Sequence, residues 1–328
     1  MKLIKIFFAL LLPAISLFAQ INDDFAGYYL GTFPNGASVC LNVSVDEEEY
    51  FGTFYVLGDT SLYGFTGMAK IERLSLYSYP PETSLKIEAV KANTTDLDAS
   101  VLLLGKKYAI RFSKMSSLAR IQDNRGTINL YAEYPKFIVP NPAFLELSQE
   151  FKRSISGSLV KFVEHIEEEA QSGRGLETLE WEKEIYYDIS YANQNFVSIL
   201  IRTYELAEGN VFRSFYSAAQ YKIDKNEAIA VGLRDLFEKR QDALQEINAY
   251  IIEYLKNTNN QFAKKGIIKY FDESQLSAFV VNQSGLQFYF PPGVISESLE
   301  YESVIVPFEV VEDFVGKTSP LTHIIKFY

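Results

Sequence analysis

The sequence predicts an α+β fold. An N-terminal all-β domain, either a small barrel or a sandwich, precedes an α+β domain with an antiparallel sheet and two long amphipathic helices. Two observations lead to this prediction. Between residues 25 and 139, apolar and polar side chains alternate in short runs separated by Gly, Pro, Asn and Asp, which is typical of antiparallel strands. After Asn141-Pro142 the apolar residues recur at the three- and four-residue steps of a helix. We therefore expect one domain over residues 20–139 and a second over residues 140–328.

The first nineteen residues have the composition of a secretory signal peptide. Lys2 and Lys5 form a positively charged head, and residues 6–12 are all apolar. Because this run is shorter than the roughly 20 residues that cross a bilayer core, a cleaved signal is favoured over an uncleaved N-terminal anchor. We expect cleavage between Ala19 and Gln20. The expected product is a periplasmic or secreted protein with no stable membrane span.

The net charge limits which partners the protein can bind, and the cysteine content limits how the fold can be stabilised. The formal net charge is −11 at pH 7, and it becomes −13 once the two lysines of the signal are removed. The basic residues are scattered among acidic ones, so neither nucleic acid nor an anionic membrane is an expected partner. Cys40 is the one cysteine of the chain, so no internal disulfide can form and stability must come from a packed core. Alternation places Cys40 with Asn42 and Ser44 on one face of a strand, where we expect the thiol to be semi-exposed.

The elements of the first half are all expected to be strands. In residues 107–113, Tyr108, Ile110 and Phe112 alternate with polar side chains, which gives the clearest strand pattern. Glycines recur between residues 27 and 67 and suggest bends or bulges in a curled sheet. The strands expected here are 38–45, 51–57, 64–73, 85–90, 101–104, 107–113 and 127–133.

In the second half the expected order is helix, strands, helix, strands. Asn141 suits a helix N-cap and Pro142 the first helical position, and Gly173 and Gly175 are expected to end that helix. A second amphipathic helix is expected from Arg234 to Lys256. The strands expected around it are 183–192, 196–206, 211–223, 277–282, 286–290 and 303–308, forming an antiparallel sheet with helices packed on it.

Part of the second half resembles a known family. Residues 277–292, SAFVVNQSGLQFYFPP, and residues 304–308, VIVPF, resemble the C-terminal signature of the domain of unknown function 3298. Members of that family show a strand, a second strand that begins with Gly-Leu, a proline-rich bend and a strand that ends in proline. Residues 187–198, with residues 221–224 and 233–237, look like the partner region known as family 4163. The resemblance covers about residues 135–315, and no motif in it is catalytic.

The resemblance implies a role in the bacterial envelope. The family includes the extracellular part of the lysozyme-sensing anti-sigma factor RsiV and the non-catalytic accessory region of peptidoglycan deacetylases. It therefore implies binding or sensing, with a secreted protein or a peptidoglycan fragment as partner. Two turns depart from the family pattern. Residues 208–212 read EGNVF where many members have Gly-Gly-Ala-His, and residues 291–295 read PPGVI. Lysozyme is accordingly not carried over as the partner.

Residues that could carry catalysis are few. The chain has two histidines: His165 is expected on a solvated helix flank, and His323 lies in the C-terminal tail. Neither belongs to a cluster with zinc-site spacing or to a Gly-x-Ser-x-Gly motif. We expect no catalytic residue, metal or cofactor, and the leading hypothesis is a non-catalytic binding or sensing protein. The alternative is a carbohydrate-active, peptidoglycan-modifying enzyme or its accessory subunit.

A candidate binding site follows from the proline-rich turn. Pro291 and Pro292 cannot continue a hydrogen-bonded ladder, so they are expected at the end or edge of a sheet. Alternation places Phe288 and Phe290 in the core under the second helix and Tyr289 on the opposite face. Loops carried on a rigid sheet commonly provide recognition. We therefore predict a partner-facing rim made of Tyr289, Pro291, Pro292, Gly293 and Val294 together with Glu208, Asn210 and Phe212.

Overall fold

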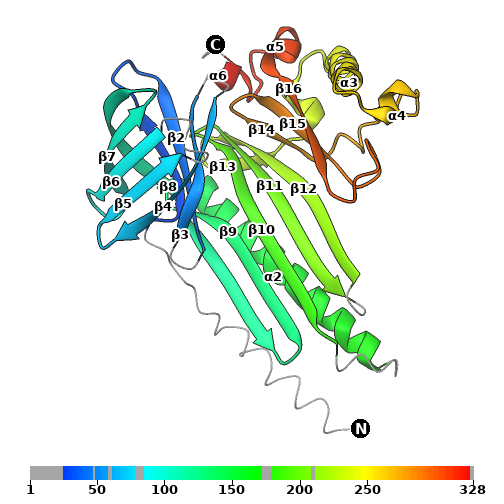
Figure 1. Ribbon diagram of the computed structural model, residues 1–328, viewed down its shortest axis with the longest axis horizontal. Helices are drawn as coiled ribbons and strands as arrows, with labels where there is room; N and C mark the ends of the chain where they lie inside the picture. Colours follow the sequence, from blue (N-terminus) through cyan, green and yellow to red (C-terminus); the bar gives the residue numbers. More distant parts are fainter. Residues whose placement is uncertain are drawn as a thin grey trace.

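The computed structural model describes residues 25–46, 49–57, 61–78, 85–171, 179–207 and 211–325. The expected signal peptide, the glycines expected to end the first long helix, and Glu208 and Asn210 lie outside these residues. Three parts are visible in Figure 1: an antiparallel barrel, a long sheet with one helix on its back, and a C-terminal layer of strands and short helices.

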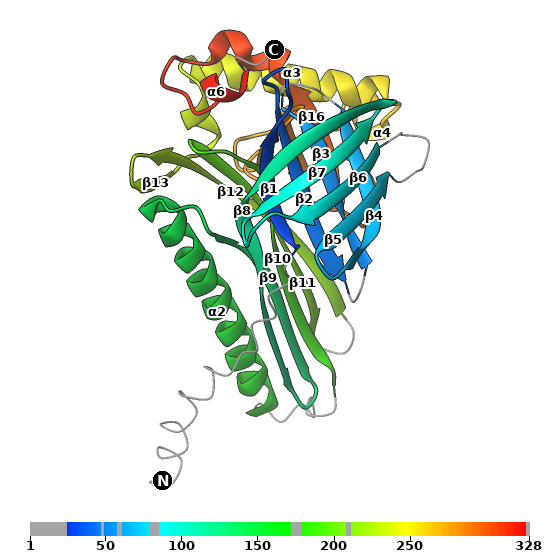
Figure 2. The same cartoon turned by 90° about the vertical axis from the view of Figure 1, so that its left-hand side faces the viewer.

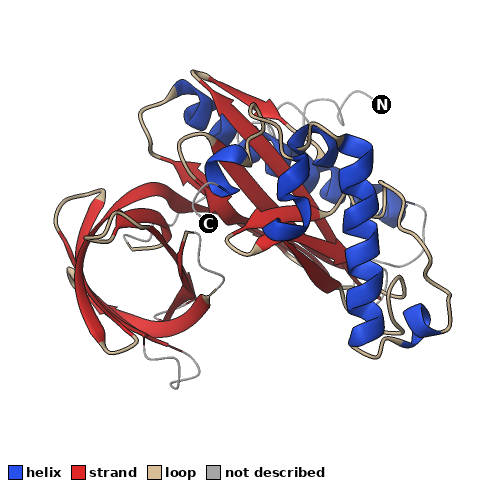
Figure 3. Cartoon of the chain, turned by 90° about the horizontal axis from the view of Figure 1, so that it is seen from above, coloured by secondary structure: helices blue, strands red, loops and turns tan. Residues whose placement is uncertain are grey.

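The N-terminal strands form a closed barrel, not a sandwich. Strands β1 to β8 pair in chain order, each antiparallel to the next, and β1 also pairs with β8 so that the ring closes (Figure 3). The interior is filled by apolar side chains from all eight strands. These described strands are β1 (Gly27–Thr32), β2 (Ser38–Asp46), β3 (Glu49–Val56), β4 (Leu62–Lys70), β5 (Arg73–Ser78), β6 (Leu85–Lys91), β7 (Asp96–Leu103) and β8 (Lys106–Arg125).

One glycine shows why the barrel strands can approach so closely. Gly52 in β3 has φ +154°, and a Cβ atom built there would lie 1.9 Å from the carbonyl oxygen of Asn42 in β2. Any larger residue would push the two strands apart. The expectation of bends or bulges also holds near Gly27, because the β1–β8 register shifts between Tyr28 and Tyr29.

The barrel and the second half of the chain share one continuous sheet. The N-terminal part of β8 pairs with β1 and β7, whereas its C-terminal part pairs with β9 (Ile128–Phe137). In the described residues the sheet then continues through β10 (Trp181–Ala192), β11 (Phe196–Ala207), β12 (Val211–Asp224) and β13 (Glu227–Ala230). Within each half the described strands pair antiparallel, as expected, whereas the pairing that joins the two halves, between β9 and β10, is parallel. A long helix between the two strands returns the chain to the end where β9 began, as parallel pairing requires.

The segment just before the expected domain boundary at residues 139–140 belongs to a strand. Tyr134 and Pro135 belong to β9, where they face Ala119 and Leu118 of β8, and both are buried. No linker is therefore found at this point. The division of the chain into two domains stays a prediction.

Limited proteolysis is expected to spare this segment. Trypsin cleaves extended, accessible chain, and Lys136 lies in a strand paired with β8, so cleavage there needs local unfolding. Lys265, exposed after a one-turn helix, is expected to be cut earlier. Mass spectrometry of an early digest checks this, and a prominent first fragment ending at Lys136 would contradict it.

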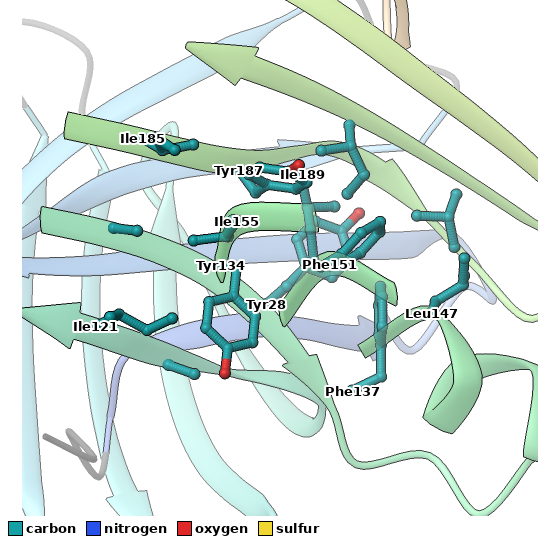
Figure 4. Packing of buried hydrophobic residues seen from close by; sticks show 14 of the residues in the cluster. Tyr28, Ile121, Tyr134, Phe137, Leu147, Phe151, Ile155, Ile185, Tyr187 and Ile189 are labelled. Atoms are coloured by element: carbon teal, nitrogen blue, oxygen red, sulfur yellow. The ribbon is translucent and has the colours of Figure 1, made fainter. Parts of the chain in front are cut away.

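Helix α2 (Pro142–Gln171) covers one face of the sheet (Figure 2). It begins where the sequence predicts: the Asn141 side-chain oxygen accepts a hydrogen bond from the Ala143 N–H at 2.9 Å. Its apolar stripe packs against β9 and β10, and Figure 4 shows Leu147, Phe151 and Ile155 among side chains of the sheet. The buried stripe consists of Ala143, Phe144, Leu147, Phe151, Ile155, Leu159, Phe162 and Ile166.

The C-terminal layer is a small antiparallel sheet under one longer helix and three short ones in the described residues. Its strands are β14 (Phe279–Asn282), β15 (Gly285–Phe290) and β16 (Glu302–Pro307). As expected, Phe288 and Phe290 are fully buried in one cluster with side chains of the helix above. The helices are α3 (Arg240–Asn257), α4 (Gln261–Lys264), α5 (Phe308–Val311) and α6 (Thr322–Ile325).

Helix α3 starts later than the sequence predicts. Residues Leu233–Leu236 form a separate 3-10 turn, in which the Asp235 carboxylate accepts a hydrogen bond from the Gly232 N–H at 2.9 Å. This local bond satisfies the turn, and the chain then extends through Phe237 before the helix begins at Arg240.

Cys40 is buried, which corrects the expected semi-exposed thiol. Its side chain does point out of the barrel, but β10 covers that part of the barrel wall, and Cys40 is 0% exposed. The Tyr28 hydroxyl donates to the Cys40 Sγ at 3.1 Å, pairs with the Tyr55 hydroxyl at 2.6 Å and accepts from the Ala192 N–H at 3.3 Å. These groups form a polar junction between barrel and sheet. Burial raises the pKa of the Cys40 thiol to about 12.

None of the helices in the described ranges is both long and apolar enough to cross a membrane.

Candidate functional site

The sheet face opposite α2 carries a row of aromatic side chains. Side chains alternate along each strand, so residues whose neighbours pack under α2 point to the other face. This face looks toward the viewer in Figure 1, between the barrel and the C-terminal layer. The aromatic row, as we call it, comprises Tyr131 (β9), Tyr186 (β10), Tyr204 (β11), Phe212 and Tyr216 (β12), Tyr289 (β15) and Tyr301 beside β16.

Neighbouring rings of the row are in contact across four strands of the large sheet. The ring centroids of Tyr131 and Tyr186 are 5.7 Å apart, and those of Tyr186 and Tyr204 are 6.0 Å apart. Tyr204 stacks on Phe212 at 6.0 Å with an interplanar angle of 22°. Its hydroxyl also lies 3.1 Å from the Tyr216 hydroxyl. Each ring therefore fixes the next, and the row presents a pre-arranged surface.

The row continues onto the C-terminal layer. Tyr216 stacks on Tyr301, with centroids 4.2 Å apart and planes 8° from parallel, and its ring lies 5.8 Å from that of Tyr289. Burial raises the pKa of Tyr216 and of Tyr289 to about 12 in each case. Both phenols therefore stay neutral hydrogen-bonding groups over the physiological pH range.

Two ion pairs lie on this face. The Arg202 Nε lies 2.8 Å from the Asp188 Oδ2, and its guanidinium lies 5.5 Å from the centre of the Tyr186 ring. Burial lowers the pKa of Arg202, but the Asp188 carboxylate outweighs it and holds the pKa above its ordinary value. The Arg120 Nε contacts the Glu133 Oε1 at 2.7 Å, and the Tyr131 hydroxyl donates to the same oxygen. These two ion pairs contact the rings of Tyr186 and Tyr131 and help to orient them.

A hollow of about 680 Å³ lies at the β12 end of the row. Phe212 is 66% exposed and Leu299 is 89% exposed, so the apolar part of the lining is accessible. Side chains from both faces of β12 line it, which places the hollow around the edge of that strand. The lining residues are Tyr204, Phe212, Arg213, Ser214, Phe215, Tyr216, Pro292, Leu299, Glu300 and Tyr301.

The structure brings some of the predicted rim residues together and separates others. Phe212 and Pro292 line the same hollow, although 80 residues of chain separate them. Pro291 and Gly293 are exposed in the adjoining turn. Tyr289 is on the expected face, but it is partly buried against Tyr216.

Val294 does not lie with the other predicted rim residues at the hollow. It packs against the apolar cluster under the helices and not into the hollow, because the turn after Pro292 leads the chain back toward that core. Glu208 and Asn210 lie outside the described residues.

Sequence reasoning missed several residues of this site. Tyr186, Tyr204 and Tyr216 lie in three successive strands. In each strand the tyrosine alternates with residues of the opposite face, and this alternation could have placed the three rings on one face of the sheet. Leu299 and Tyr301 lie in the connection before β16, where no periodic pattern marks them.

Groups suited to metal binding do not gather in the described part of the chain. Within those ranges no cluster of three or more His, Cys, Asp or Glu side chains could hold a metal ion. His165 is exposed on α2, and His323 lines a different hollow of about 420 Å³ beside the barrel, with Tyr191 and Asn193.

Comparisons with known proteins give structural neighbours. A crystal structure of a DUF3298 family protein from Pseudomonas aeruginosa PAO1 is similar, with a TM-score of 0.43 and 11% identity, covering 62% of this chain and 93% of that chain. A DUF3298 family member from Bacteroides fragilis has a TM-score of 0.37 and 14% identity, covering 65% of this chain and 98% of that chain. No family profile and no curated protein matches the sequence. The structural neighbours are thus DUF3298 family proteins, the family whose C-terminal signature residues 277–308 resemble.

Proposed function

We propose that this protein is an exported, non-catalytic binding or sensing protein of the bacterial envelope. In this proposal the signal peptide is removed after Ala19, and the product acts in the periplasm or outside the cell. The ligand is a secreted protein or a cell-wall fragment. It is held at the hollow formed by β12, Pro292 and Tyr301.

The observation that carries the proposal is the accessible aromatic lining of the hollow. Large apolar side chains exposed side by side are costly in water, and on soluble proteins such patches mark interaction sites. Phe212 and Leu299 are both more than half exposed and line the same hollow, and the Phe212 ring stacks on that of Tyr204. A ligand that covers them gains apolar burial without having to order the site.

Tyrosine-rich surfaces suit polypeptide partners. Tyr and Phe are enriched at the centres of protein interfaces, where the ring supplies contact area and the hydroxyl a hydrogen bond. Trp181, the single tryptophan, is buried under α2 and is not available as a platform for sugar rings. These features favour a secreted protein over a glycan as the ligand.

The variant that tests the site replaces Phe212 and Tyr301 by alanine. Truncation of a central aromatic anchor typically costs 2 kcal/mol or more, which is about a thirtyfold loss of affinity. We therefore expect the double variant to bind its envelope ligand at least about thirtyfold more weakly, measured by surface plasmon resonance on the ligand recovered from envelope extract. Tyr270→Ala is the matched control: that ring is also exposed, at 56%, but it lies away from the hollow, so its affinity should be unchanged.

Two results would contradict the proposal. One is an unchanged affinity of the double variant when circular dichroism shows that it is folded. The other is turnover of purified peptidoglycan by the protein, which would support the alternative of a peptidoglycan-modifying enzyme. Tyr289→Ala is a poor probe here, because that ring packs against Tyr216 and its loss would disturb the contact between the two sheets.

A further inference from the structure

The outer edge of β12 is open along most of its length. On one side β12 pairs with β11 from Val211 to Lys222. On the other side β13 pairs only with the segment from Tyr221 to Asp224, and one further bond joins the Val231 N–H to the Gln220 carbonyl at 2.9 Å. Within the described chain no strand pairs with residues 211–219 on this outer side. Figure 1 shows β12 at the margin of the large sheet.

Two backbone hydrogen bonds show which groups of β12 face outward. The Gln220 carbonyl bonds outward to Val231, whereas the Ile223 N–H bonds inward to the Asn195 carbonyl at 2.8 Å. In a strand the N–H and C=O of one residue point to the same edge, and successive residues alternate. Even-numbered residues of β12 therefore turn their backbone groups to the open edge. These residues are Phe212, Ser214, Tyr216 and Ala218.

Among the described residues, this edge carries little of the usual protection against strand pairing. Natural sheet edges are shielded by charged side chains, prolines, bulges or covering segments. Residues 211–219 contain no proline and a single charged residue, Arg213. Val211 and Phe215 are 44% and 48% exposed, so the edge is also apolar. The pairing with β11 is continuous here, with no register shift.

A hollow lies at each end of the open edge. The aromatic hollow of about 680 Å³ surrounds residues 212–216. A second hollow of about 430 Å³ adjoins Ala218 and Gln220 and is also lined by Leu233 and Ser277. Residues 212 and 218 are about 20 Å apart along a strand, at roughly 3.4 Å per residue. A strand of about seven residues would thus span both hollows.

We propose that the β12 edge accepts an extended polypeptide segment of the partner as an added strand. The added strand lies in line with β13, bonds to the four even-numbered residues and places an apolar or aromatic side chain in each hollow. This inference rests on the proposed function, because it uses the same hollow, and it specifies the ligand as a peptide backbone. Main-chain bonds supply the affinity and the two hollows supply the selectivity, as in other cases of strand addition. The chain is acidic, with a net charge of −11, so an acidic segment is disfavoured.

The probe is a phage-displayed library of random 12-residue peptides, panned against the purified protein. We expect enriched peptides with alternating apolar residues and few acids. On binding of one such synthetic peptide, the amide protons of Phe212, Ser214, Tyr216 and Ala218 should exchange with solvent at least about tenfold more slowly, because each gains a hydrogen bond. Nuclear magnetic resonance measures this exchange on the unmodified protein.

A substitution tests the same edge. Ser214→Pro removes one outward N–H while leaving the bonds to β11 intact, and proline is tolerated at sheet edges. We expect it to weaken peptide binding at least about tenfold. Ser214→Ala is the matched control, because it removes the hydroxyl but keeps the N–H, and its affinity should stay within about threefold of the parent.

The outcomes separate this inference from the proposed function. If no peptide is enriched, or if an enriched peptide binds without protecting the four amides, strand addition is wrong. If the envelope ligand is lost with Phe212 and Tyr301 but not with Ser214→Pro, the hollow binds its ligand without a ladder and only this inference fails. If neither set of variants affects ligand binding, the proposed site fails as well. Self-association of the protein that Ser214→Pro abolishes would assign the edge to a second copy of the chain and overturn the peptide proposal.

Discussion

Replacing Phe151 by alanine is expected to lower the free energy of unfolding by about 3–5 kcal/mol. Phe151 lies in the first half of α2, is 1% exposed and packs in the contact between helix and sheet. Its ring centroid lies 5.2 Å from that of Tyr187, 6.0 Å from that of Tyr221 and 6.4 Å from that of Phe137 (Figure 4 shows Phe151 beside Phe137 and Tyr187). These rings come from three different strands, so they cannot all collapse into the cavity that alanine would leave.

Urea unfolding followed by circular dichroism measures this loss. Leu145→Ala is the control on the same helix, because Leu145 is 49% exposed and its loss should change the stability by less than about 0.5 kcal/mol. A loss below about 1.5 kcal/mol for Phe151→Ala would mean that α2 contributes little to the fold.

The second large effect is a loss of stability at alkaline pH that depends on Cys40. Burial raises the pKa of this thiol from 9.0 to about 12, so the folded protein keeps a proton that the unfolded chain releases. The stabilisation that the buried, neutral Cys40 thiol contributes is therefore complete below pH 9 and is lost as the pH rises from 9 toward 12. For one proton the slope is about 1.4 kcal/mol per pH unit. Burial also raises the pKa values of Tyr28 and Tyr55, so their contributions act in the same direction above about pH 10.

Unfolding in urea at pH 8, 9 and 10 with a reductant present tests this dependence. Cys40→Ser keeps a hydroxyl within reach of Tyr28 but does not titrate in this range, so its stability should fall less steeply between pH 9 and 10. If the stability of the two proteins falls in parallel with pH, the thiol does not lose its proton on unfolding in this range. That result would contradict the raised pKa of the buried thiol.

Local patterns predicted the elements better than their pairing. Asn141-Pro142 marks the start of α2 because capping is decided by a few neighbouring residues. The barrel could not be distinguished from a sandwich, because closure depends on pairing β1 with β8, whose partner residues are 81 to 90 positions apart along the chain. The parallel pairing of β9 with β10 was missed for the same reason, since short-range alternation carries no information on strand direction.

The candidate site shows the same limit. Alternation correctly separated Phe288 and Phe290 from Tyr289, because one face of β15 is buried by the helices above. It could not show that Tyr289 would meet Tyr216, since that contact depends on how two sheets pack. Cys40 illustrates this too: its face of β2 was assigned correctly, but the cover supplied by β10 comes from a distant part of the chain.

The parallel pair β9–β10 has a consequence for the order in which the chain folds. An antiparallel hairpin such as β10–β11 needs only a short turn, so it can form early from neighbouring residues. β10 cannot join β9 until the chain between them, which includes the whole of α2, has been brought back across the sheet. Contacts of such long sequence separation form slowly, because loop-closure entropy must be lost before they are made. The docking of α2 is therefore the step at which a barrel and a separate strand meander become one sheet, and its rate should govern how long the facing edges of β9 and β10 stay unpaired and exposed to other chains during folding.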